Sequence, residues 1–161
     1  MLAAVNSRLT WNPGPQDFRF PVVAEVYRYW TERRGQRPMP GRADIDPLAM
    51  RGALGNIALI EVHRDPLRFR IRLAGTYQAE RLGMDPTGLW LEDLPAPEYR
   101  DLLLGRLQQV VARPQPLLAH NRQMMDDRWY DYEALWLPLG TEDGVDMVLA
   151  CQIFADAPQG G

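Results

Sequence analysis

Several residue types are scarce or missing in this chain of 161 residues, and each absence removes a class of chemistry. No lysine occurs, which excludes Schiff-base catalysis and a phosphate-binding loop built on lysine. Cys151 is the only cysteine, so an intramolecular disulfide and a cysteine-rich metal site are ruled out. Ser7 is the only serine, and its sequence context gives no support for a serine nucleophile with a histidine base.

Long apolar runs are also missing. None approaches the ~20 residues that a membrane-spanning helix needs, and the N-terminus does not read as a secretion signal. We therefore expect a cytoplasmic protein that does not engage a membrane. The formal net charge of −3 is not that of a typical nucleic-acid-binding protein, so we do not expect a nucleic-acid partner.

Two helices are predicted with clear signals. In residues 17–34, Val23, Val26, Tyr27 and Trp30 fall at helical spacing and form one apolar stripe. Because this stripe is wider than one docking surface needs, we expect these four residues to belong to an interaction helix. Residues 97–113 form the second helix, and a shorter one follows Asp46 and Pro47.

Five strands are predicted, in a group of two and a group of three. Residues 56–62 and 68–74 alternate in the manner of a hairpin, and residues 116–125, 130–139 and 145–154 form the second group. The last strand is apolar on both faces, so it needs cover on both sides. We expect an α+β fold: a five-stranded antiparallel sheet with short helices on one face and the N-terminal helix on the other.

The domain organisation follows from the same pattern. Residues 17–155 are expected to form a single domain, while residues 1–16 and 156–161 read as flexible ends.

Segments along most of the chain, from about residue 27 to residue 154, carry a resemblance to a known family. "YWTERRGQRPMPGRADIDP", "IALIEV", "RFRIRLAGT", "LGMDPTGLWLEDL" and "LWLPLG" follow one another in an order that resembles the PAS domain, more narrowly a family of small stand-alone PAS proteins of alphaproteobacteria. In that fold the second strand leaves the sheet and turns into short helices that cup its inner face. The resemblance implies that the chain makes this turn at Gly75.

Structural roles are expected around this turn. Gly75 would permit it, Thr76 would cap the first helical piece, and Gly83 and Gly88 would allow later changes of direction. Arg72, at the strand end, is expected to bind an acidic side chain. Arg68 and Arg70 are read as an exposed strand face in preference to an anion or nucleic-acid site.

A small cavity between sheet and helices is the predicted ligand site, because the PAS resemblance implies one. Its expected lining consists of five residues: Tyr77, Trp90, Leu103, Leu107 and Trp136. The same side chains would equally fill a dry core, and the identity of a ligand is unknown.

Other candidate sites have ordinary explanations. Glu61, His63 and Asp65 share one strand face but fit a solvated strand end better than a metal site, and His120 fits a simple hydrogen bond. Heme-binding PAS domains take an axial histidine from the long helix, and residues 97–113 contain none. Flavin photosensors use a cysteine on the helices, whereas Cys151 lies in the last strand as a small buried residue.

Acidic residues at a predicted hairpin turn are the remaining catalytic candidates. Asp126, Asp127 and Asp131 stand there, and turn chemistry alone explains them. We expect no enzymatic activity and no catalytic residue.

The leading functional hypothesis is a PAS sensory and protein-interaction domain in signal transduction. It would have no output domain of its own and would act through a partner protein or a homodimer, with a small molecule possible in its cavity. The alternatives are a small enzyme on a cone-shaped α+β fold of the ketosteroid isomerase type, using a buried carboxylate, and a structural adaptor that binds no ligand.

Overall fold

The computed structural model describes residues 5–125 and 127–155, and it contains one antiparallel sheet. The spatial order of the strands is β1-β4-β5-β6-β2-β3. Their bounds are Val5–Trp11 (β1), Ile57–His63 (β2), Arg68–Ala74 (β3), Leu117–Met125 (β4), Arg128–Thr141 (β5) and Gly144–Phe154 (β6).

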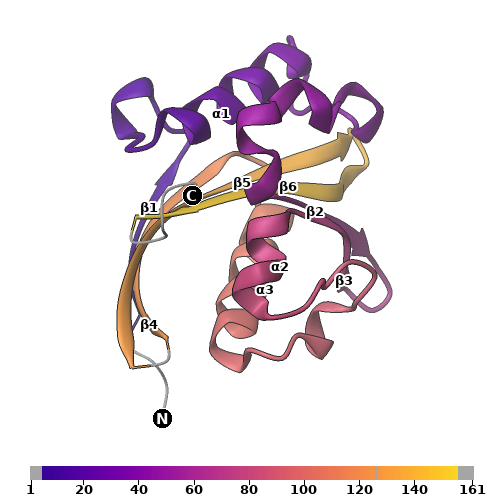
Figure 1. The fold of residues 1–161 in the computed structure, drawn as a ribbon. Coiled ribbons are helices and arrows are strands. Elements are labelled where there is room, and N and C mark those ends of the chain that lie inside the picture. The colour runs from indigo at the N-terminus through magenta and orange to yellow at the C-terminus, as the bar shows by residue number, and fades with distance from the viewer. Residues whose placement is uncertain (1–4, 126, 156–161) are drawn as a thin grey trace.

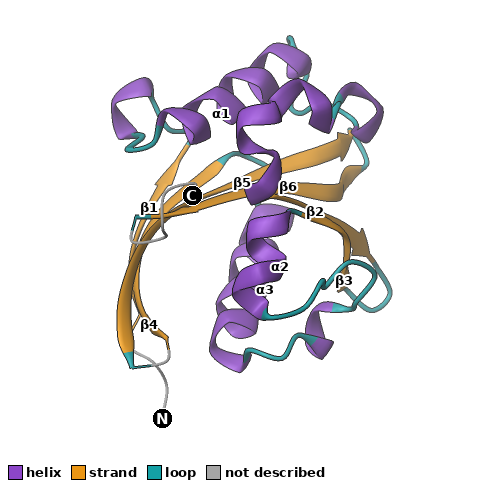
Figure 2. Ribbon diagram, viewed as in Figure 1, coloured by secondary structure: helices purple, strands orange, loops and turns teal. Residues whose placement is uncertain are grey.

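Helices lie on both faces of this sheet (Figures 1 and 2). One layer, which we call the outer layer, holds α1 (Pro21–Arg34) and the 3₁₀ segments η1 (Pro15–Asp17), η2 (Arg42–Asp44) and η3 (Pro47–Asn56). The inner layer holds α2 (Thr76–Leu82), η4 (Leu91–Asp93) and α3 (Pro97–Ala112). The predicted α+β architecture with cover on both faces is confirmed.

The central strands β5 and β6 are buried from both sides. Both contact α1 on the outer face and α3 on the inner face. Successive strand residues point to opposite faces, so Leu135 and Leu137 face the outer layer while Ala134 and Trp136 face the inner layer. All four are at most 2% exposed. The two helical layers are therefore packed on the same pair of strands.

The outer layer is fastened to β5 by α1. Val23, Val26 and Trp30 are fully or almost fully buried, and the Trp30 indole Nε1 donates a hydrogen bond to the Pro138 carbonyl at 2.9 Å. The expectation that these residues form a contact surface for a partner is therefore wrong: their stripe is core, and Tyr27 packs beside it half-buried. The stripe is wide because it covers a two-strand apolar surface.

The chain leaves the sheet after β3, as predicted. Residues 76–94 form α2, a turn and η4, and are neither an extended ladder nor one continuous helix. Gly75 has an ordinary extended backbone, with φ −68° and ψ 159°. The position requires glycine because a Cβ there would lie 2.3 Å from the Gly55 carbonyl oxygen. Two backbone segments cross at this point with no room between them.

Capping of α2 differs from the prediction. Gly75, not Thr76, is the N-cap residue, and Thr76 is the first residue of the helix. Gly83 ends α2 in the left-handed conformation, with φ +76°. Gly88 also has a positive φ, +91°, and the chain there folds back along β3.

The outer edge of β3 is covered by this returning chain. Ile71 donates its N–H to the Leu89 carbonyl at 2.9 Å and accepts from Gly88 at 2.7 Å, and Arg70 forms a bridge with Trp90. Paired in this way, the β3 edge is unavailable as a template for another strand.

The N-terminal segment contains a strand that the sequence did not predict. Residues 5–11 form β1, which pairs with β4 from Val5↔Gln123 to Trp11↔Leu117, so the sheet has six strands and residues 5–11 are not a loose end. The predicted first helix also begins later, at Pro21, because residues 15–17 form the separate turn η1. The predicted flexible tail, residues 156–161, lies outside the described residues.

The Gly75 crossing leads to a stability prediction. Replacing Gly75 by alanine forces the Gly55 backbone to move, and we expect a loss of roughly 1–3 kcal/mol in the free energy of unfolding. Gly105 in α3 is the matched control, since a Cβ there meets nothing within 4 Å; Gly105→Ala should stabilise by about 0.5–1 kcal/mol. Urea unfolding measures both, and a neutral Gly75→Ala would contradict the crossing.

Candidate functional site

A small hollow lies between the inner helices and the sheet. Its volume is about 30 Å³, room for about one water molecule. The walls are mostly apolar and come from six elements: Ala58, Ile60, Ile71, Leu82, Leu103, Trp136 and Ala150. Three polar side chains, Gln78, Tyr99 and Gln152, also face it, and the Tyr99 hydroxyl donates to the Gln152 side-chain oxygen at 2.9 Å.

The five predicted lining residues are distributed unevenly around this hollow. Leu103 and Trp136 line it, whereas Leu107 is fully buried in the core and is not one of the residues that line the hollow. Tyr77 is 46% exposed, with its ring against Gly55, and Trp90 lies outside the hollow against β3. Both aromatic residues flank the Gly75 turn and the returning chain, where the backbone directs them away from the interior.

Trp90 has a different role on the β3 surface. The Arg68 guanidinium lies 3.8 Å from its ring centroid, and the His63 ring packs edge-on at 5.0 Å. Arg68 also forms an ion pair with Glu92, and the Arg70 Nε donates to the Gly88 carbonyl at 2.9 Å. These arginines hold the returning chain onto the strand. For Arg72, no acidic partner lies within 4 Å among the residues that the structure describes.

On the outer face, Glu133 of β5 forms a buried polar centre that the sequence analysis missed. The side chain is fully buried and accepts from the backbone N–H of Arg19 at 2.7 Å and of Phe20 at 3.3 Å. Its Oε2 also lies 2.7 Å from Nε2 of His120, the facing residue of β4. His120 therefore makes the simple hydrogen bond that was expected, and Glu133 fixes the chain just before α1.

The other catalytic and metal candidates have structural roles or lie outside the described parts. Asp126 is outside them, Asp127 occupies a turn with φ +60°, and Asp131 lies 4.0 Å from Arg122. His63 Nε2 contacts the Glu61 carboxylate at 3.0 Å. Within residues 5–125 and 127–155 no group of three potential metal ligands occurs, and no helix is both long and apolar enough to cross a bilayer.

Cys151 is buried in β6, and burial raises the pKa of its thiol to about 12. It lies opposite Leu135 of β5 and Ile57 of β2, away from the inner helices. Its environment is that of a packing residue.

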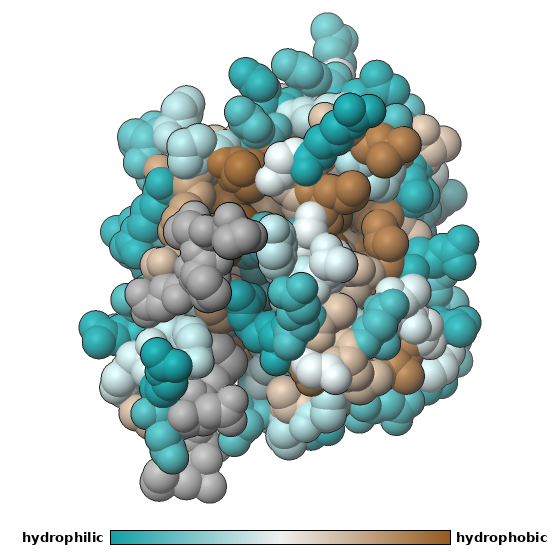
Figure 3. Space-filling model, in the orientation of Figure 1, coloured by the Kyte–Doolittle hydropathy of each residue, from teal (hydrophilic) through white to brown (hydrophobic). Residues whose placement is uncertain are grey.

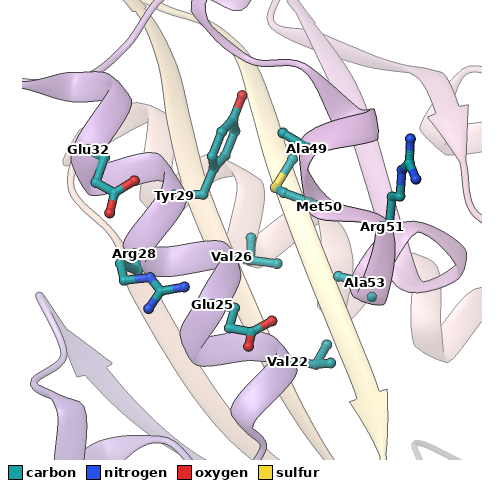
Figure 4. A pocket seen from close by; sticks show the side chains of 11 residues that line it. Val22, Glu25, Val26, Arg28, Tyr29, Glu32, Ala49, Met50, Arg51 and Ala53 are labelled. Carbon is teal, nitrogen blue, oxygen red and sulfur yellow. The ribbon is translucent and has the colours of Figure 1, made fainter.

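A larger groove runs along the outer surface between α1 and η3 (Figure 4). Its volume is about 260 Å³. Its apolar lining residues are Val22, Val26, Met50 and Ala53, of which only Val22 is partly exposed. The charged lining residues are Glu25, Arg28, Glu32 and Arg51. Figure 3 shows hydrophobic side chains gathering over this helical layer. Leu48, in η3, is 61% exposed.

Comparison with known proteins assigns the chain to a family. A family model described as PAS domain matches residues 19–152, and the chain belongs to the PAS domain family. No curated protein matches the sequence.

One similar solved structure is described as an RNA-binding light-oxygen-voltage receptor, with a TM-score of 0.46 and 10% sequence identity. The match covers 95% of this chain, which spans only 39% of that receptor chain.

Glu133 supplies a second prediction. Removing its carboxylate by Glu133→Ala leaves two backbone N–H groups and His120 without their partner, and we expect a loss of roughly 3 kcal/mol or more in unfolding free energy. Glu32→Ala, on the groove rim, is the control and should change stability by less than about 0.5 kcal/mol. Equal urea midpoints for the two variants would show that Glu133 does not anchor the outer layer.

The thiol of Cys151 gives a third prediction. At pH 8 a group with a pKa near 12 is almost entirely protonated, and burial adds a barrier to reagent. A disulfide reagent such as dithionitrobenzoate should therefore label the folded protein at least ~100-fold more slowly than the urea-unfolded chain. Rapid labelling of the folded protein would contradict this burial.

Proposed function

We propose that this PAS domain is a cytoplasmic sensory and interaction module that signals through a partner protein or a second copy of itself. The observation that carries the proposal is membership of the PAS family, whose domains are sensory, together with a hollow between helices and sheet. A small molecule admitted to the inner side would be the signal. No step of the proposal requires catalysis by the domain.

The α1–η3 groove is the contact surface that we favour. With the apolar stripe of α1 buried, the helix has only its other faces for a partner, and the groove is the larger of the two hollows described above. Leu48 beside it offers exposed apolar area. Apolar surface flanked by charged side chains is typical of protein contacts.

An enzyme with a buried carboxylate receives less support. Glu133 is fully buried on the face away from the inner hollow, and three donors surround its two oxygens. A general base needs a free oxygen within reach of a substrate proton. This carboxylate serves a structural purpose, so the signalling role is preferred.

The contact surface can be tested by blocking the groove. Ala49 is exposed in the groove lining and Ala112 is exposed at the end of α3, so Ala49→Arg and Ala112→Arg form a matched pair. Native mass spectrometry of protein purified from its own host should show a dimer or a partner complex. We expect Ala49→Arg to weaken that complex at least ~10-fold and Ala112→Arg to leave it unchanged.

Two outcomes would contradict the proposal. One is a monomer without any bound protein at all concentrations tested. The other is a complex that both variants weaken equally, since that result removes the groove from the contact.

A further inference from the structure

A group of long polar side chains surrounds an aromatic pair on the inner face, near the end where β1 and β4 lie. We call Arg81, Arg106, Gln123, Tyr132 and Phe154 the inner arginine cluster. They come from α2, α3, β4, β5 and β6, so five separate elements converge on it.

Contacts link most members of the cluster directly. The Arg81 guanidinium carbon lies 3.4 Å from the centroid of the Phe154 ring. Phe154 stacks on Tyr132 with centroids 4.4 Å apart, and the Tyr132 hydroxyl donates to the Gln123 side-chain oxygen at 2.8 Å. The charge of Arg106 acts on the same Tyr132 hydroxyl.

The two arginines differ from the ion-paired arginines elsewhere. Arg37 pairs with Asp44 and Arg68 with Glu92, whereas the described residues place no acidic oxygen within 4 Å of Arg81 or Arg106. Burial lowers the pKa of both guanidinium groups. The cluster therefore holds two positive charges, one exposed and one half-buried, without a countercharge from these residues.

Hydrogen-bond donors are in excess as well. Among the residues that the structure describes, the Arg106 Nε is buried without an acceptor, and its Nη1 reaches only the Gln109 side-chain oxygen at 3.2 Å. Gln123 is fully buried, and its Nε2 likewise finds no partner within the described ranges. A buried donor without an acceptor costs about 1–3 kcal/mol, so the absence of two acceptors from one cluster needs an explanation.

We propose that the inner arginine cluster binds one oxyanion, a carboxylate or a phosphate group of a small molecule. An oxyanion supplies the missing negative charge and accepts from guanidinium and amide donors together. This inference rests on the proposed function, because it names the ligand chemistry of the inner side. In this proposal the ligand is recognised by the guanidinium groups of Arg81 and Arg106, which are not among the lining residues predicted from the sequence.

Access is set by the two arginines themselves. Arg81 is exposed and Arg106 half-buried, and both are long, flexible side chains at the helical side of the cluster. The adjoining hollow, lined by Tyr99 and Gln152, takes about one water molecule. The oxyanion therefore enters as these side chains swing to meet it, and a larger ligand body stays at the surface between α2 and α3.

The test is a titration with two probes, sodium phosphate and sodium benzoate, at ionic strength held constant with sodium chloride. The readouts are the arginine Nε–Hε resonances in ¹H–¹⁵N NMR spectra and the thermal unfolding midpoint. We expect saturable shifts of the Arg81 and Arg106 signals. Saturation by benzoate alone identifies a carboxylate ligand, by phosphate alone a phosphate ligand, and by both a general oxyanion site.

Variants locate the binding. Arg81→Gln and Arg106→Gln should each weaken binding at least ~10-fold, and Arg106→Lys should retain part of it. Arg64→Gln, at an exposed position in the turn between β2 and β3, is the control and should bind as the wild type does. Urea unfolding checks that each variant is folded. If Arg106→Gln does not fold, Arg106→Lys takes its place in the binding measurement.

Three results would overturn the inference: no saturable response to either probe, a response unchanged in both the Arg81→Gln and Arg106→Gln variants, or an equal loss in Arg64→Gln. If the cluster binds no oxyanion, a protein complex that Ala49→Arg weakens can still be observed. Failure of this inference is therefore distinguishable from failure of the proposed signalling role.

Discussion

The structure depends on one constraint: β5 and β6 are apolar on both faces and must be covered twice. Burial of large apolar side chains is worth roughly 1.5–3 kcal/mol each, so neither face can be left in water. The chain meets this demand with α1 and its 3₁₀ segments on one side and α2, η4 and α3 on the other. The late position of β4, β5 and β6 in the sequence means that every covering helix precedes them.

Much of this arrangement can be predicted from sequence where a pattern is local. The alternation in residues 68–74 places β3 at its observed bounds, and the last strand, apolar on both sides, correctly predicts two layers. β1 has no comparable signal. Its partner β4 lies more than 100 residues away, and as an edge strand with half-exposed side chains it shows only weak alternation.

Side-chain contacts between distant elements were the part that sequence could not supply. Nothing around Glu133 indicates that its carboxylate meets the N–H groups of Arg19 and Phe20, because that meeting depends on the path of the chain before α1. Tyr77 and Trp90 are expected in the cavity from sequence because both belong to the short helical segments over the sheet. Their actual directions depend on the crossing of Gly55 and Gly75, which only the assembled fold defines.

Tyr132 and Glu133 are consecutive in β5, and their side chains therefore project to opposite faces of the sheet. Tyr132 belongs to the aromatic stack beneath α2 and α3, while Glu133 holds the chain at the start of α1. One peptide unit therefore connects Tyr132, packed under the inner helices, to Glu133, which binds the chain just before α1. A displacement of this strand segment would therefore be felt on both faces of the sheet at once.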